Sequence, residues 1–212
     1  MYADNSHYTF THAKFWIIDD QFCMSTGNLT FTGYKKNRDF IYCDSSTRHL
    51  ESLSEVFRSD FVHEKPLFST PLPSSLGLSP INMRDFLTNY ITGAKSSLVI
   101  YVQSLSDEDI LSLLESKKKE GVRIEICVAQ NNDTTTLPTL SGITIHTLKK
   151  PYLHAKALVR DNQDLLLGSM NLTQNALDNN REVGIILQKN EKILSQVHRI
   201  ISMDCGFPKF AK

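Results

Sequence analysis

One arrangement of residues occurs twice in this chain of 212 residues. Each copy has a histidine, a lysine two residues later and an aspartate seven residues after the histidine, as HAKFWIID at 12–19 and HAKALVRD at 154–161. Each copy continues through a short hydroxylated turn to an asparagine, Asn28 or Asn171, and reaches an acidic residue eleven positions later. A spacing kept over this length predicts two copies of one structural unit.

The H-x-K spacing is suited to a β-strand. Side chains two positions apart on a strand point to the same face of the sheet. The histidine and the lysine of each copy therefore reach into one cleft, while the alanine between them faces the packed interior. The repeat thus predicts a polar site with a histidine and a lysine from each copy.

This pattern resembles the signature of the phospholipase D superfamily, which reads H-x-K, four residues, D, six residues, G-S-x-N. The second copy fits at every position. The first copy is one residue shorter after its aspartate, and it has Ser25 and Thr26 where the second has Gly168 and Ser169. The resemblance implies an α/β fold, the phospholipase D-like α/β/α sandwich, with two repeated halves.

The resemblance also implies a covalent mechanism. In that family one histidine attacks phosphorus to form a phosphohistidine, and the other protonates the leaving oxygen before it activates water or an alcohol. This route divides one difficult displacement into two easier ones. The attacking imidazole must be neutral and in the correct tautomer, which a carboxylate on its other nitrogen can ensure. By position in the repeat, we expect Glu182 to orient His154 and Asp39 to orient His12.

The lysines and asparagines suit the charge of a phosphodiester, whose anionic oxygens must be neutralised before a nucleophile can approach. The expected catalytic residues are His12, Lys14, Asn28, Asp39, His154, Lys156, Asn171 and Glu182. The expected phosphate ligands are Lys14, Lys156, Asn28, Asn171, Thr26 and Ser169. The two hydroxyl residues fit a purely local role in their turns equally well.

The aspartates of the two motifs, Asp19 and Asp161, precede tight turns, where aspartate caps backbone groups. The resemblance gives this aspartate a mainly structural role, so we assign both to the scaffold together with Gly168. The family reaction uses no metal or other cofactor, and the sequence has no competing cluster of metal ligands.

The two copies differ in what surrounds them. Residues 82–212 have the pattern of a complete α/β half, with alternating helical and strand periodicities and a polar loop at 129–141. Residues 1–62 match only the back part of that half, with motif strands, a strand at RDFIYC and a helix from about 46 to 61. The stretch 63–81 contains four prolines and several serines, which predicts a surface linker.

The short first copy suggests that the chain is the C-terminal part of a longer protein or that its start is placed late. Unpaired strand edges must then be covered by a partner chain. One hypothesis is a symmetric homodimer that brings His154 of each chain into one cleft.

Composition places few further limits on the chain. Lysine plus arginine and aspartate plus glutamate both number 23, so the basic excess of a dedicated nucleic-acid binder is absent. The four cysteines have no C-x-x-C spacing, and we expect reduced, buried thiols. Without an apolar leader or a long apolar run, we expect a cytoplasmic protein that can contact a membrane surface.

The resemblance to the phospholipase D superfamily implies a phosphoric diester hydrolase or transferase that acts on phospholipids through a phosphohistidine. The first alternative is a metal-independent nuclease of the same superfamily. The second is an inactive fragment that serves as a binding or assembly module.

Overall fold

The computed structural model describes residues 7–130 and 140–207, so most of the loop expected at 129–141 lies outside the described residues. The elements from residue 76 onward are β5 (Leu76–Ser79), α3 (Met83–Thr92), β6 (Ser97–Val102), α4 (Glu108–Lys119), β7 (Arg123–Ala129), β8 (Ile145–Leu148), β9 (Tyr152–Leu153), β10 (Lys156–Arg160), β11 (Asp164–Gly168), α5 (Gln174–Asp178), β12 (Glu182–Gln188) and α6 (Glu191–Cys205). All of these strands except β9 form a seven-stranded mixed sheet in the order β5-β12-β11-β10-β6-β7-β8. The predicted α/β class is confirmed.

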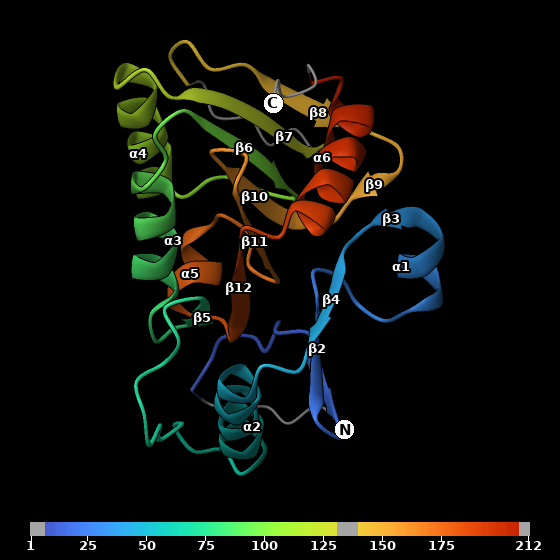
Figure 1. Ribbon diagram of the computed structural model, residues 1–212, viewed down its shortest axis with the longest axis vertical. Coiled ribbons are helices and arrows are strands. Elements are labelled where there is room, and N and C mark those ends of the chain that lie inside the picture. The colour runs from blue at the N-terminus through green and yellow to red at the C-terminus, as the bar shows by residue number, and fades with distance from the viewer. Residues whose placement is uncertain (1–6, 131–139, 208–212) are drawn as a thin grey trace.

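The large sheet is covered on both faces (Figure 1), with α3, α4 and α5 on one side and α6 on the other. Alternation along β10 explains the two cores. Ala157 and Val159 join the core that contains α6, whereas Leu158 joins the core beneath α3 and α4. Because successive side chains on a strand point to opposite faces, a short apolar run can serve both cores.

Local capping sets the limits of the longer helices. The Asp107 side chain accepts from the N–H of Ile110 at the start of α4, and Asn190 caps α6 in the same way. α6 ends at Gly206, whose φ of 68° is the left-handed conformation that glycine adopts without strain. Within the described ranges, no helix has the length and apolar character needed to cross a bilayer.

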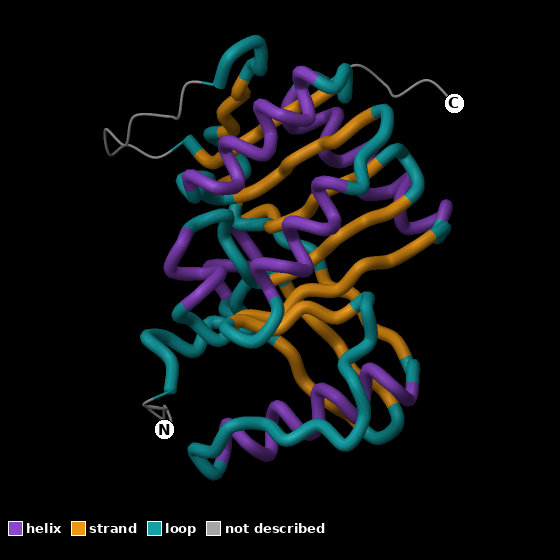
Figure 2. The backbone as a smooth tube through the Cα atoms, turned by 90° about the vertical axis from the view of Figure 1, so that its left-hand side faces the viewer, coloured by secondary structure: helices purple, strands orange, loops and turns teal. Residues whose placement is uncertain are grey.

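The first half contains β1 (Phe15–Ile18), β2 (Gln21–Ser25), α1 (Phe31–Lys36), β3 (Asn37–Arg38), β4 (Ile41–Asp44) and α2 (Thr47–Phe61). Its antiparallel sheet β1-β2-β4 has the same succession as β10-β11-β12. The stretch expected as one strand at RDFIYC is two, because β3 leaves this sheet and pairs in parallel with β9. In Figures 1 and 2, α2 lies below the large sheet, and its Leu53 and Val56 pack in the same core as β10 and α6.

The first half is open where the second half is covered. In the described part of the chain, no elements before β1 correspond to α3, β6, α4 or β7. Leu177 of α5, which packs beside α3, is 1% exposed, whereas Tyr34 on α1 is 83% exposed. A partner that covers this surface stays a prediction.

The stretch expected to be a surface linker contains part of the large sheet. β5 is buried along its whole length and pairs antiparallel with β12, with Leu78 opposite Val183. The prediction of a linker through residue 81 is therefore wrong for these residues. Proline favours loops, but the apolar LGLS between Ser75 and Pro80 is long enough for an edge strand, where proline at the end is tolerated.

The aspartates of the two motifs occupy equivalent turns with left-handed backbone, with a φ of 52° at both Asp19 and Asp161. The Asp161 carboxylate accepts from the backbone N–H groups of residues 95, 96 and 97 at 2.7–3.0 Å. These bonds lower the pKa of Asp161 against the opposing effect of burial. The contacts tie β10 to the start of β6 and support a scaffold role.

All four cysteines are paired, so the prediction of reduced thiols is wrong. Cys23 and Cys43 lie opposite each other on β2 and β4, and Cys127 of β7 is bonded to Cys205 at the end of α6. Both pairs are made by chain segments that meet only in the folded structure, and for this reason the spacing along the sequence did not reveal them. Disulfides persist in oxidising compartments, which counts against the expected cytoplasmic location.

Removal of the Cys127–Cys205 disulfide should cost more stability than removal of Cys23–Cys43. The first closes a loop with a sequence separation of 78 and the second one of 20, which corresponds to about 4.5 and about 3.3 kcal/mol of unfolded-state entropy. Denaturant unfolding of the two double alanine variants measures the difference. A thiol reductant that leaves the unfolding midpoint of the native chain unchanged would contradict the prediction.

Candidate active site

His12 is held by two consecutive residues of the second half. Thr11 forms a parallel bridge with Arg181, whose carbonyl accepts from the backbone N–H of His12 at 2.9 Å. The next residue, Glu182, opens β12, and both of its carboxylate oxygens lie 3.0 Å from His12 Nδ1. An ionised carboxylate can only accept, so His12 Nδ1 carries the proton.

His154 is held in the same manner by the first half. It follows β9, which runs beside β3, and its backbone N–H donates to the Arg38 carbonyl at 3.2 Å. The next residue, Asp39, accepts from His154 Nδ1 at 3.1 Å. The side chains of His154 and Asp39 are 12% and 18% exposed, so this pair is shielded but remains in reach of a ligand.

The pairing between histidines and acids is therefore crossed, and the expected pairs within each copy are wrong. The backbone before each histidine runs parallel to the residue before the other copy's acid, at Thr11–Arg181 and at Leu153–Arg38. That register carries each acid across to the opposite histidine. Repeat spacing alone is compatible with either pairing, because it does not define how the halves meet.

The two turn hydroxyls contact the carboxylates. Thr26 Oγ1 donates to Asp39 Oδ1 at 2.8 Å and accepts from the N–H of Phe40 at 2.9 Å. Ser169 Oγ donates to Glu182 Oε2 and accepts from the N–H of Val183 at 3.0 Å. Each hydroxyl has one proton, and that proton is directed at an acid. The structure thus favours carboxylate orientation over the phosphate contact that the sequence also allowed.

The two motif lysines lie close to both acids. Burial lowers the pKa of Lys14 to about 8, against the attraction of Glu182 and Asp39. Burial also lowers the pKa of Lys156 to about 7, and the like charge of Lys14 contributes to the same shift. The four charged groups come from both halves and influence one another, which indicates one shared site.

Lys156 has a polar neighbour, Gln103, that the sequence motif does not include. Its Nζ donates to Gln103 Oε1 at 3.1 Å and to the His154 carbonyl at 2.7 Å. Gln103 directly follows β6 and also donates to the hydroxyl of Tyr152 at 3.0 Å. Its place after a buried strand, at the strand end where the motif lies, was the signal that could have identified it.

The two asparagines occupy different environments. Asn28 is exposed and lines a pocket of about 460 Å³ together with Gly27 and Asp39. Asn171 is partly buried, and its Oδ1 is buried without a hydrogen-bond partner in the part of the chain that the structure describes. Gly27 is a further site residue that the motif did not mark, because a Cβ there would lie 2.0 Å from Asp39 Oδ2.

Gly168 is required by packing. A Cβ at this position would lie 2.3 Å from Met170 Sδ and 2.7 Å from the Val183 carbonyl. These contacts agree with the expected scaffold role. Residues 7–130 and 140–207 contain no group of three or more His, Cys, Asp or Glu side chains placed to hold a metal ion.

Comparison with known families assigns the chain to one of them. A family model described as "Cardiolipin synthase, PLD-like domain" matches residues 87–205, which is more than half of the chain. The chain belongs to this PLD-like family. The match contains the second motif with His154 and Glu182, whereas the first motif precedes it. The resemblance to the phospholipase D superfamily is thus confirmed.

Individual members of the superfamily extend the comparison. The chain is 22% identical over 178 residues to a cardiolipin synthase of Halalkalibacterium halodurans, covering 70% of this chain and 35% of that protein. It is similar to the solved structure of Nuc, a phospholipase D family member from Salmonella typhimurium, with 25% identity and a TM-score of 0.55 over 61% of this chain and 91% of Nuc.

One similarity in fold covers most of this chain. A phosphatidylserine synthase from Haemophilus influenzae superposes with a TM-score of 0.65 over 89% of this chain and 60% of that structure, at 14% identity. The first two curated relatives are longer than the matched part, and the chain spans 35% and 51% of their lengths.

Proposed function

We propose that this chain cleaves or transfers a phosphodiester through a phosphohistidine, without a metal ion. The observation that carries the proposal is that each motif histidine has its Nδ1 held by a carboxylate of the opposite half. Within the described residues, the Nε2 atom of neither ring has a hydrogen-bond partner. Both rings therefore offer Nε2 for chemistry.

The crossed contacts suit both chemical steps. With the proton fixed on Nδ1, the Nε2 of one histidine has the lone pair that a nucleophile needs. The Nε2 of the other, when protonated, can donate to the leaving oxygen and later take a proton from water or an alcohol. The acid on Nδ1 stabilises each ring when it becomes positively charged, as in other histidine–carboxylate pairs.

The lysines and asparagines supply the electrostatic part of the proposal. Lys14 and Lys156 come from opposite halves and, with Asn28 and Asn171, are the donors proposed to hold the phosphoryl oxygens. A phosphodiester anion that enters between the lysines offsets their mutual repulsion, which favours their charged forms in the complex. Charge neutralisation of this kind is a large contribution to phosphoryl transfer.

The lysines predict the pH dependence of the reaction. A lysine is charged below its pKa, which burial lowers to about 7 for Lys156 and about 8 for Lys14. We therefore expect kcat/KM to fall as pH rises through 7 to 8, and kcat to fall only at higher pH because the bound anion raises both pKa values. Initial rates over a pH series measure both limbs. A kcat/KM that stays constant from neutral to strongly alkaline pH would contradict this assignment.

Phospholipids are the substrate class that we propose. The description of the matching family and the similarity to a cardiolipin synthase and, in fold, to a phosphatidylserine synthase support this choice. The direction of reaction, hydrolysis or transfer to an alcohol, depends on the acceptor that reaches the second histidine. We further propose an oxidising compartment, because the two disulfides would be reduced in the cytosol.

The test uses phosphatidylglycerol with a radioactive phosphate, presented in vesicles with EDTA, and single-stranded DNA in a parallel reaction. The expected result is release of the lipid head group and protein-bound label after an alkaline quench in detergent, which preserves phosphohistidine. Loss of activity in EDTA would overturn the metal-independent mechanism. Cleavage of DNA alone would assign the nuclease alternative, and inactivity toward both would support a binding or assembly module.

A further inference from the structure

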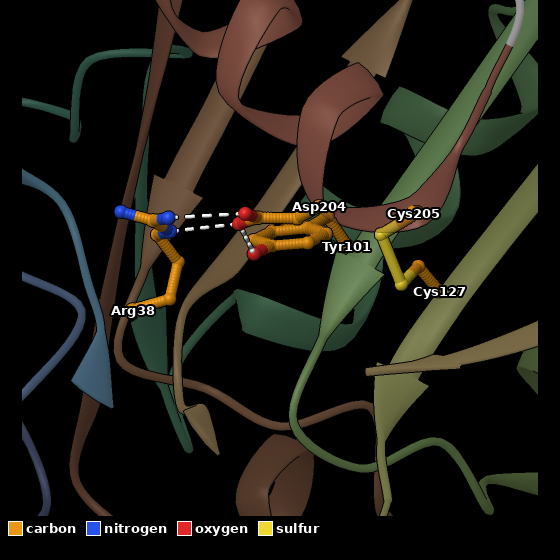
Figure 3. The surroundings of a disulfide bond; sticks show 5 residues. All are labelled: Arg38, Tyr101, Cys127, Asp204 and Cys205. Atoms are coloured by element: carbon orange, nitrogen blue, oxygen red, sulfur yellow. Dashed lines mark hydrogen bonds and ion pairs between the residues drawn. A yellow bond between two sulfur atoms is a disulfide. The ribbon is translucent and has the colours of Figure 1, made fainter. Parts of the chain in front are cut away.

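The side chain of Arg38 forms a two-point bond with the end of α6. Its Nε donates to Asp204 Oδ2 at 2.7 Å and its Nη2 donates to Asp204 Oδ1 at 3.0 Å. The hydroxyl of Tyr101, a fully buried residue of β6, donates to the same carboxylate at 2.6 Å. Figure 3 shows the guanidinium of Arg38 facing the carboxylate of Asp204 and Tyr101 meeting it from the other side.

The backbone of Arg38 is equally engaged. Its carbonyl accepts from the N–H of His154 at 3.2 Å, and the following residue, Asp39, holds His154 Nδ1 at 3.1 Å. The dipeptide Arg38–Asp39 therefore contacts His154 at both its backbone and its ring. The guanidinium fixes this dipeptide to the second half, which is the half that contains His154.

The same construction occurs around His12. Arg181 Nε and Nη2 each donate to an oxygen of Asp60 at 2.9 Å, and the hydroxyl of Tyr8 donates to Asp60 at 3.1 Å. The Arg181 carbonyl accepts from His12, and Glu182 follows it. Asp60 and Asp204 are both the second-to-last residue of their helices, α2 and α6. Two independent occurrences argue that the arrangement serves the site.

The two arrangements differ in one covalent feature. Cys205, which follows Asp204, is bonded to Cys127 on β7, so the end of α6 is fixed to the large sheet (Figure 3). The corresponding position after Asp60 is Phe61, which is 71% exposed. The carboxylate that receives Arg38 is thus anchored more firmly than the one that receives Arg181.

We propose that Arg38 and Asp204 are positioning residues, which set the Asp39 carboxylate against His154 and thereby fix the tautomer and the aim of that ring. The inference rests on the proposed phosphohistidine chemistry. Arg38 acts through Asp39 and does not contact the substrate. A displacement of about 1 Å in a catalytic group can lower a rate about 10²-fold. Loss of the two-point bond between Arg38 and Asp204 should therefore reduce kcat strongly and leave KM nearly unchanged.

The experiment compares Arg38→Met and Arg38→Lys with the native chain by kinetics and by NMR of the histidine ring protons. In both variants we expect kcat to fall about 10- to 100-fold, because lysine keeps the charge but cannot make the two-point bond. The Nδ1–H signal of His154 should exchange faster with water, whereas that of His12 should be unchanged. Asp204→Asn combined with Arg38→Met should be no slower than Arg38→Met alone.

The matched control is Arg58→Met. Arg58 makes the same two-point contact with Glu55, at 3.1 and 2.9 Å, but on an exposed face of α2, so neither kcat nor the histidine signals should change. An unchanged His154 signal in folded Arg38→Lys would overturn the proposal, and so would an equal loss of both histidine signals. The NMR measurement needs no substrate, so it separates the two proposals. If the native protein were inactive but the His154 signal changed selectively, the positioning role of Arg38 and Asp204 would stand and the proposed function would be rejected.

Discussion

His12→Asn and His154→Asn should each lower the kcat for phosphodiester cleavage by about 10⁴-fold or more, because one removes the nucleophile and the other the proton donor. The amide of asparagine is neither a nucleophile nor a proton donor to the leaving group, and it is polar enough to remain in the partly buried position. Initial rates with a lipid phosphodiester in EDTA measure the loss, and circular dichroism verifies that both variants fold. His63→Asn is the control, because His63 is exposed and has a φ of 60° that asparagine tolerates.

A substrate with a p-nitrophenol leaving group separates the two roles. This leaving group needs no proton, so the variant that lacks only the acid should still form the covalent adduct and should accumulate it when water is not activated. The variant that lacks the nucleophile should not become labelled at all. If His12→Asn retained full activity while His154→Asn lost it, a site made of two copies of His154 in a homodimer would replace the single-chain site.

The candidate site residues could be recognised in the sequence because their spacing is local. The histidine and lysine of each motif are two positions apart on extended backbone, and each hydroxyl turn directly follows the second strand of the motif hairpin, β2 or β11. Such short-range geometry is the same in any fold that contains the strand and the turn. The helices α4 and α6 could also be predicted from sequence, since their caps and apolar periodicity lie within or next to the helices themselves.

Most of the errors concern contacts between segments that are not neighbours in sequence. The crossed contacts of Asp39 with His154 and of Glu182 with His12 accompany the parallel β3–β9 pairing. Strands of two residues have too short a pattern to be predicted from sequence. The disulfides likewise join β2 to β4 and β7 to α6. β5 was hidden for another reason, since proline and serine around it outweighed four apolar or small residues whose partner strand, β12, begins about a hundred residues later.

Arg181→Ala should lower the free energy of unfolding by about 3–5 kcal/mol, since it breaks a buried ion pair and leaves one partner uncompensated. The Arg181 side chain is 0% exposed, bonded to Asp60 and to the Ser79 carbonyl at 3.0 Å, and stacked 4.0 Å from the ring centre of Tyr8. It joins α2 of the first half to β12, the strand that begins with Glu182. Urea unfolding followed by tryptophan fluorescence measures the loss.

Two further variants isolate the cause. Arg181→Met combined with Asp60→Leu removes both charges and should recover most of the stability, because no buried ion is left unpaired. Arg58→Ala removes an exposed arginine of a similar two-point pair and should cost far less stability than Arg181→Ala, because solvent screens exposed ion pairs. If the double variant were as unstable as Arg181→Ala, lost packing around the guanidinium would account for the effect.

The pH dependence of Arg181→Ala gives the sign of the electrostatic part. In the native chain burial raises the pKa of Asp60 to about 7, and loss of the neighbouring positive charge should raise the pKa of this carboxyl further in the variant. A carboxyl whose folded pKa is raised disfavours folding when it is ionised, so the extra penalty in the variant is full above the variant's own Asp60 pKa and disappears as pH falls below the native value of about 7. The stability difference between Arg181→Ala and the native chain should therefore shrink from pH 8 to pH 5. A difference that is constant over this range would mean that the unpaired Asp60 carboxylate is hydrated in the variant. The Arg181–Asp60 pair beside His12 would then contribute to stability through packing alone.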